Sequence, residues 1–348
     1  MVLSILYVGL LGLASYYWIS SSSSNHIPAS DAGAFSILIP FRNESKNLES
    51  LCDSLENQTY ESGKWECIFI DDHSEDNGWE IITQRCNSRF RIILNTGIGK
   101  KAAIRTGLSI AKFERIAQID ADGLLQPDWL KSFHQKPGFV TGPVQISNPT
   151  TWLQYFQVFD LMALMGITYA GIRSGLWYMA NGANMVYPRA LQQSIDIRSN
   201  PYQSGDDMFL VERAKELNIP VSFIKDQNSI VKTAACENVR QLIHQRLRWA
   251  TKNKAMKSWG LKMALSLVIL FNLSLIILPI LRFKFIVLWI IKMMADYIYF
   301  KIIAPFFNTE IKTLQFIPCS LFYPFFISVI SMLSALHLKY EWKGRKLK

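Results

Sequence analysis

Cysteine is scarce in this chain of 348 residues, and the spacing of its five cysteines excludes two classes of site. No two of them form a CxxC pair or another spacing typical of metal ligands, which argues against a zinc site and a redox dithiol. Several fall in strand-like or strongly apolar runs, so we expect buried thiols in a reducing compartment. The five are Cys52, Cys67, Cys86, Cys236 and Cys319.

Charged residues are missing from residues 2–19 and sparse in residues 261–337. The first run predicts an uncleaved membrane anchor, because it lacks the basic start and the small-residue cleavage site of the alternative, a signal peptide. The second region contains three stretches, 261–281, 285–307 and 314–337, that approach the roughly 20 residues needed to span a bilayer. The sequence between these regions has an ordinary soluble composition, which predicts a globular domain anchored in a membrane.

Acidic residues are the minority, and the formal net charge is +10. Basic residues flank the C-terminal apolar region, which favours anionic lipid headgroups over nucleic acid and places both flanks in the cytoplasm. Two cytoplasmic flanks require an even number of crossings, yet three candidates are present. The middle candidate carries Lys292, Asp296 and Lys301, which are costly in hydrocarbon unless they are paired or line a cavity. Either one segment is interfacial or re-entrant, or the basic tail lies on the other side.

Strand-like and helix-like segments alternate between residues 35 and 119. We expect strands at 35–40, 65–70, 90–94 and 115–119, with helices at 45–57, 79–86 and 100–112 between them. This alternation predicts an α/β domain with a mostly parallel sheet. Because ligands bind at the carboxyl ends of strands in such sheets, the polar residues that follow strands are the candidates for function.

Asp120 and Asp122 flank one alanine directly after the fourth predicted strand. Two carboxylates at that spacing can hold Mg²⁺ or Mn²⁺ together with the phosphate oxygens of a substrate. The alternative is an acidic turn that caps the helix expected near Pro127.

Asp71 and Asp72 end the second predicted strand. Their carboxylates can accept hydrogen bonds from a nucleobase or a ribose, or this acidic loop can simply cap the next helix through Ser74 and Asp76. The glycines at 97 and 99 precede Lys100; they do not form a Walker A loop, but they allow close approach to a nucleotide.

Two later stretches carry further candidates. Asp206 and Asp207 open a helix, where acidic residues favour the helix dipole, and the functional alternative is a general base. Gln245, Arg248 and Trp249 have the spacing i, i+3, i+4, which places them on one helical face. A guanidinium and an indole together suit a group that is anionic and flat. The basic amphipathic helix around them is expected on the bilayer surface, and apolar residues 151–173 form either a second interfacial element or a core helix.

Over about residues 34–260 these motifs together resemble the family 2 glycosyltransferases with the GT-A fold, in particular the ceramide glucosyltransferase-like and polysaccharide synthase-like branches. The stretches that carry the resemblance are IPFRNE at 39–44, DDHSED at 71–76, Gly99-Lys100 with Gly107, DAD at 120–122, GDD at 205–207 and QRLRW at 245–249. The resemblance implies an inverting transfer from a nucleotide-diphosphate sugar, assisted by Mg²⁺ or Mn²⁺.

On the donor side, the resemblance implies that Asp71 and Asp72 contact the base and ribose, with Lys100 nearby. It further implies that Asp122 ligates the metal on the pyrophosphate, and that Asp120 supports the nucleotide or the metal. Uridine is favoured as the base by family habit alone.

On the acceptor side, Asp207 matches the family's general base, and Asp206 stands where a glutamate is commoner. Gln245, Arg248 and Trp249 match the motif that borders the pyrophosphate and the acceptor, and Arg248 is expected to neutralise the leaving diphosphate. Because a phosphate acceptor needs no base, Asp207 favours a hydroxyl of a membrane lipid or a lipid-linked glycan. The alternatives are a processive polysaccharide synthase, a polyprenyl-phosphate glycosyltransferase and a non-catalytic subunit that binds nucleotide sugars.

The expected organisation follows from these assignments. It comprises a transmembrane anchor (1–20), a linker (21–33), a GT-A domain (34–236), an interfacial helix with the QxxRW motif (237–260), a transmembrane region of two or three crossings (261–338) and a basic tail (339–348). The chain is expected to be an integral protein of the inner or plasma membrane whose catalytic domain faces the cytoplasm, with no nucleic-acid partner.

Overall fold

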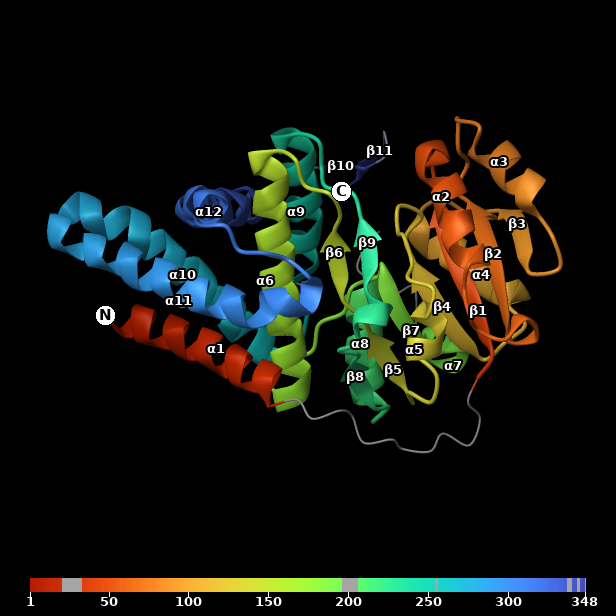
Figure 1. Cartoon of the computed structure of the whole chain (residues 1–348), viewed down its shortest axis with the longest axis horizontal. Coiled ribbons are helices and arrows are strands. Elements are labelled where there is room, and N and C mark those ends of the chain that lie inside the picture. Colours follow the sequence, from red (N-terminus) through yellow and green to blue (C-terminus); the bar gives the residue numbers. More distant parts are fainter. Residues whose placement is uncertain (21–32, 196–205, 254–255, 337–339, 343–344, 348) are drawn as a thin grey trace.

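A seven-stranded sheet forms the centre of the middle domain (Figure 1). The computed structural model describes residues 1–20, 33–195, 206–253, 256–336, 340–342 and 345–347. In the order β3-β2-β1-β4-β7-β5-β8, all neighbours pair in parallel except β7, which is antiparallel to β4 and β5. The strands are β1 (Phe35–Phe41), β2 (Trp65–Asp71), β3 (Phe90–Leu94), β4 (Arg115–Ile119), β5 (Phe139–Thr141), β7 (Asn184–Pro188) and β8 (Val221–Phe223). The prediction of a mostly parallel α/β sheet is confirmed.

Helices cover both faces of this sheet, which explains why its strands are continuous apolar runs. On one face, Leu48, Leu51 and Leu55 of α2 recur at helical spacing and are fully buried against the sheet. On the other face, Ile104 of α4 and Leu210 of α8 are equally buried. The helices are α2 (Ser45–Glu56), α3 (Gly78–Arg85), α4 (Lys100–Ile110), α5 (Trp129–Ser132), α7 (Arg189–Gln193) and α8 (Asp206–Glu216), with short 3-10 turns η1 (Ser62–Lys64) and η2 (Gln227–Ser229).

The remaining elements form an apolar helical part beside this domain (Figure 1). A small parallel sheet of β6 (Val144–Ile146) and β9 (Val231–Thr233) leads into it. Its helices are α1 (Val2–Ile19), α6 (Trp152–Ser174), α9 (Val239–Asn253), α10 (Trp259–Leu281), α11 (Val287–Ile303) and α12 (Thr313–Ala335); η3 (Phe283–Ile286) and η4 (Ala304–Phe307) flank α11, and a hairpin of β10 (Tyr340–Trp342) and β11 (Arg345–Leu347) follows. In Figure 1, α1 lies alongside α10 and α11, and both α1 and α11 contact α6.

Within the described part of the chain, four helices are long and apolar enough to cross a membrane, namely α1, α6, α10 and α12. They differ sharply in burial: 72% of the most apolar stretch of α6 is buried, against 17% for α10. Of the two alternatives for residues 151–173, the core helix is therefore the one observed. Helix α6 begins with a capping box at Thr151 and Gln154, and its buried side chains surround it on all sides.

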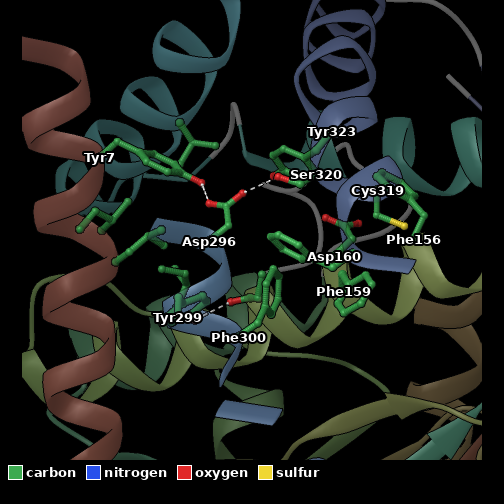
Figure 2. A pocket seen from close by; sticks show the side chains of 16 residues that line it. Tyr7, Phe156, Phe159, Asp160, Asp296, Tyr299, Phe300, Cys319, Ser320 and Tyr323 are labelled. Carbon is green, nitrogen blue, oxygen red and sulfur yellow. Dashed lines mark hydrogen bonds between the residues drawn. The ribbon is translucent and has the colours of Figure 1, made fainter. Parts of the chain in front are cut away.

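Two of the three charged residues of α11, Lys292 and Asp296, are buried and paired with each other. Lys292 Nζ lies 2.6 Å from Asp296 Oδ2 and 3.1 Å from the hydroxyl of Ser320 on α12. Tyr7 of α1 donates a hydrogen bond of 2.7 Å to Asp296 Oδ1. Figure 2 shows Tyr7 and Ser320 pointing at Asp296 beside an apolar cavity of about 90 Å³. Lys301, in contrast, lies on the exposed side of the helix.

The C-terminal hairpin packs against α9, the helix that precedes the apolar region. The two basic flanks of that region are therefore neighbours in space.

All five cysteines are free, and the expectation of buried thiols holds for Cys52, Cys67 and Cys319. Cys86, which directly follows α3, is exposed, and Cys236 is half-buried.

Candidate active site

A cleft of about 720 Å³ opens at the carboxyl ends of β1, β2 and β4 and is closed on its far side by α9. It brings together predicted site residues that lie up to 177 positions apart in the sequence, the distance from Asp72 to Trp249. The predicted site residues on its wall are Asp72, Lys100, Asp120, Asp122, Asp207, Gln245, Arg248 and Trp249. Asp71 is not part of this wall, and the side chain of Asp206 lies outside the described part of the structure.

Asp120 and Lys100 form an ion pair in the cleft between the end of β4 and the start of α4. Burial raises the pKa of Asp120, but the Lys100 ammonium and the Arg248 guanidinium outweigh it, so the pKa of this carboxyl lies below its ordinary value. Burial likewise lowers the pKa of Lys100, but Asp120 and Asp207 together hold it above its ordinary value. Both groups are therefore ionised at neutral pH.

Asp122 is oriented by a partner that no motif includes. Its Oδ2 accepts a hydrogen bond of 2.8 Å from the hydroxyl of Thr233 at the end of β9. The Gly123 amide donates to the Asp120 carbonyl at 3.0 Å, which closes the DAD triplet into a tight turn. Helix α5 starts only at Trp129 with Asp128 as its N-terminal flanking residue, so the alternative that this turn caps a helix is wrong.

Asp207 enters the cleft from the first turn of α8. Its Oδ2 accepts from the Gly182 amide at 3.2 Å and its Oδ1 accepts from the Met208 amide at 2.9 Å. A methyl group added at Gly182 would lie 3.5 Å from Asp207 Oδ2 and 3.5 Å from Lys100 Nζ. The carboxylate, the ammonium and the loop around Gly182 thus face the same point in the cleft.

Asp71 and Asp72 are adjacent, but their carboxylates accept hydrogen bonds from different loops. Asp71 Oδ1 accepts from the amide and the hydroxyl of Ser74, at 2.9 and 2.5 Å, so this side chain shapes the loop after β2. Asp72 Oδ1 accepts from Asn95 at 2.7 Å and from the Gly99 amide at 2.8 Å, and the residue lines the cleft. The loop at Gly99 is thereby tied to the end of β2.

The expected capping of the helix after Asp76 is only partly right. No side chain caps α3 at its flanking residue Asn77. Asp76 accepts from the Gly78 amide at 3.1 Å and, more closely, from the Ser45 amide at 2.8 Å, where α2 begins.

The helix α9 places Gln245, Arg248 and Trp249 on the wall of the cleft, as their spacing predicts. It also places there Arg246, which was not singled out in the sequence. The Arg246 guanidinium lies 4.1 Å from the centre of the Trp249 ring, and its Nη1 donates to Gln245 Oε1 at 2.6 Å. It is the partner of Asp160 on α6 as well.

Other residues of the site could not be found from motifs. Thr233 ends a strand of three residues, and Gly182 lies in a loop within an apolar stretch. Gln157 is a buried polar residue on α6 that binds the backbone of Cys236 at 2.8 and 3.0 Å, and so fixes another segment of the cleft wall. Only the polarity of Gln157 within a mostly apolar helix hints at such a role.

The donor set favours a cation completed by substrate over a closed protein cage. Within the described residues, no group of three or more histidine, cysteine, aspartate or glutamate side chains is arranged to hold a metal ion. Asp120 and Asp122 supply two carboxylates on the wall of an open cleft, which fits a hard cation that retains positions for phosphate oxygens.

Comparison with known proteins agrees with this geometry. Residues 36–136 match the family described as glycosyl transferase family 2, and residues 116–332, more than half of the chain, match glycosyl transferase family group 2. A poly-beta-1,6-N-acetyl-D-glucosamine synthase of Staphylococcus epidermidis is 26% identical over 45% of this chain, and a dolichyl-phosphate beta-glucosyltransferase of Trichomonas vaginalis is 32% identical over 28%. The chain covers 41% and 32% of these two relatives, less than half of each.

Among solved structures, the mannosyltransferase PcManGT of Pyrobaculum calidifontis, in complex with GDP-Man and Mn²⁺, has a TM-score of 0.58 at 16% identity, covering 96% of this chain and 97% of that one. This likeness establishes a shared GT-A-like fold. With the family matches, it means that the chain belongs to the family 2 glycosyltransferases and is an enzyme of that family.

Proposed function

We propose that the protein is an inverting glycosyltransferase that moves a sugar from a nucleotide-diphosphate sugar, preferably a UDP-sugar, to a hydroxyl of a membrane lipid or lipid-linked glycan. The observation that carries the proposal is the convergence of Asp207, Asp122 and Arg248 on one cleft beside the apolar helices. The cleft offers separate charged groups for the diphosphate and for the acceptor proton.

On the donor side, Asp122 and Asp120 would hold Mg²⁺ or Mn²⁺, which when bound neutralises charge on the diphosphate. A solved relative of the same fold contains Mn²⁺, which supports the choice of metal. Lys100 and Arg248 add fixed positive charge on the same wall, so charge that develops on the leaving diphosphate meets preorganised cations. Asp72 is the residue proposed to contact the nucleoside, while Asp71 holds its loop.

On the acceptor side, Asp207 is proposed as the general base. The acceptor oxygen bonds to the anomeric carbon while the bond from that carbon to the diphosphate breaks, and the acceptor proton passes to Asp207. The amides of Gly182 and Met208 hold the carboxylate in place for this transfer. Trp249 and Asp206 are proposed to border the acceptor. General base catalysis of this kind contributes about 10²–10⁴ in rate.

The position of the cleft supports a lipid acceptor. Helix α9 forms its far wall, and α6, which contributes Gln157 and Leu161 to the wall, packs on its other side against α1 and α12. We propose that α1, α10 and α12 cross the membrane and that α9 lies at its surface. The contact of the C-terminal hairpin with α9 supports a topology with both basic flanks on the same side of the membrane, which we propose to be the cytoplasmic side by the positive-inside rule.

The experiment is a transfer assay with the purified full-length chain, a panel of nucleotide sugars, Mn²⁺ and a total lipid extract, with products identified by mass spectrometry. We expect a single sugar on a lipid hydroxyl, and a loss of about 10²–10⁴ in turnover for Asp207→Asn with nucleotide binding retained. Asp226→Asn, which makes the same change at a cap outside the cleft, serves as the matched control.

Undiminished turnover in Asp207→Asn would show that this residue is not the base. A product glycosylated on a polyprenyl phosphate would show that the acceptor is a phosphate and not a hydroxyl. This acceptor is the second candidate, because one relative is named a dolichyl-phosphate glucosyltransferase. A polymeric product would identify a processive synthase, as the name of the staphylococcal relative would lead one to expect.

A further inference from the structure

Arg246 on α9 contacts three other side chains at the wall of the cleft. Its Nε and Nη2 donate to Asp160 Oδ2 at 2.8 and 2.7 Å, its Nη1 donates to Gln245 Oε1 at 2.6 Å, and its guanidinium lies over the Trp249 ring at 4.1 Å. One side chain thus contacts two of the three residues of the QxxRW motif.

Asp160 anchors this arrangement from a different element. It lies on α6, the helix between the cleft and the apolar cavity, and Figure 2 shows its carboxyl group at the wall of that cavity, next to Phe159. The side chains of Arg246 and Asp160 are only 9% and 17% exposed, so their attraction is weakly screened by solvent. The position of the guanidinium is therefore fixed by α6 rather than by α9 alone.

We propose that Arg246, held by Asp160, is a positioning residue that sets the orientation of Gln245 and Trp249 at the acceptor side of the cleft. The inference rests on the proposed function, because it assigns Trp249 to the acceptor. It couples the orientation of the motif to α6, which packs against α1 and α12. Movement of α6 relative to α9 would change how Trp249 is presented.

The chemistry of the guanidinium makes this role specific to arginine. A planar fork donates in several directions at once and stacks flat on an indole, whereas a lysine ammonium is a point charge on a flexible stem. Lysine at position 246 can keep the attraction to Asp160, but it cannot also hold Gln245 and cover Trp249 in the same geometry.

The test compares Arg246→Lys, Asp160→Asn and the double variant in the full-length chain, with kcat and the KM for acceptor and donor measured separately. We expect each single variant to lower kcat by about tenfold, the cost of a small misplacement near the chemistry, while donor KM is unchanged. Because both variants act by displacing the same guanidinium from Gln245 and Trp249, the double variant should be no less active than the less active of the two single variants.

A spectroscopic readout separates positioning from a loss of stability. In protein labelled with fluorotryptophan, the fluorine resonance of Trp249, assigned with Trp249→Phe, should shift in Arg246→Lys and also in Asp160→Asn. The matched control is the ion pair of Arg91 and Glu66, which has an N–O distance of 2.6 Å and lies outside the cleft. Arg91→Lys and Glu66→Gln should leave kcat and the Trp249 resonance unchanged.

The inference would be overturned if the effects of Arg246→Lys and Asp160→Asn on kcat were additive. It would also be overturned if the Trp249 resonance did not shift in Asp160→Asn. A rise in donor KM equal to the fall in kcat would instead make Arg246 a donor-binding residue. Failure of the proposed function looks different, because in that case Asp207→Asn and Arg248→Ala would also retain full turnover.

Discussion

Thr233 provides the clearest single contact that the proposed metal site depends on. Its hydroxyl holds Asp122 Oδ2 at 2.8 Å, and partners of this kind commonly change metal affinity by about 10–100-fold when removed. We expect Thr233→Val to raise the Mn²⁺ concentration for half-maximal transfer by about tenfold, with kcat at saturating Mn²⁺ largely restored. Thr233→Ser keeps the hydroxyl and should behave as wild type; an equal defect in Thr233→Ser would show that the methyl group matters instead.

The Lys100–Asp120 ion pair makes the stability of the folded protein depend on pH, and the direction follows from the two pKa shifts. The pKa of Asp120 is depressed below 3.8, so its contribution to stability is present above that pH and is lost as the pH falls through its folded-state pKa. The pKa of Lys100 is raised above 10.5, so its contribution is lost only as the pH rises through that raised value. Asp207 and Arg248 face the same pair, and their charges contribute to both pKa shifts.

The stability difference between wild type and Lys100→Met should therefore be constant from about pH 5 to about pH 9 and shrink in acid below the ordinary carboxyl pKa. Thermal unfolding at a series of pH values measures it. A difference that changes steadily through neutral pH would mean that another group controls the pair. Any change in activity within that window has to come from a different residue.

At the scale of elements, the helical part is held together by a buried charged cluster on α1, α11 and α12. Lys292 is fully buried, and removing one partner of such a pair typically costs about 3–5 kcal/mol, whereas replacing both by apolar residues is often neutral. We expect Lys292→Met to lower the thermal midpoint clearly, and Lys292→Met with Asp296→Leu to recover most of it. Lys301→Met is the control, because that lysine is exposed on the same helix. A double variant as unstable as the single one would contradict this account.

The elements with strong local signals were predictable, and the others were not. The strands β1 to β4 are apolar runs that sit between helices of clear periodicity, and the structure confirms them. β5 and β8 have only three residues each and exist because they pair with their neighbours in the sheet, for which the local sequence carries no signal. Helix α6 is mostly apolar and has apolar residues on every side, a pattern that fits a core helix and a membrane helix equally well.

The site likewise contains residues that could be predicted from local sequence signals and residues that could not. Asp120, Asp122 and Asp207 follow strands or open helices, so their meeting in one cleft followed from the topology of the sheet. Asp71 and Asp72 could not be told apart, because only the fold determines which of two adjacent carboxylates turns into the loop. The pairing of Arg246 with Asp160 joins residues 86 positions apart and depends on how α6 packs against α9.

At the scale of the whole molecule, the cleft lies between the α/β domain and the apolar helices, and both basic flanks lie near α9. This arrangement predicts that the α/β domain faces the cytoplasm. Cys86 is exposed on that domain, whereas the other four cysteines are buried or half-buried. A thiol reagent that cannot cross membranes should label Cys86 in inside-out vesicles but not in sealed cells, and Cys86→Ser should abolish the signal. Labelling in sealed cells would reverse the orientation.

The central claim is that carboxylates at one rim of the sheet hold a divalent cation together with a diphosphate. The most direct measurement is Mn²⁺ binding to the purified full-length chain, followed by electron paramagnetic resonance with and without a nucleoside diphosphate. We predict that one Mn²⁺ binds per chain when the diphosphate is present, that binding is weak without it, and that Asp122→Asn reduces it by at least about tenfold. Mn²⁺ binding that is independent of the diphosphate and unchanged in Asp122→Asn would contradict the account.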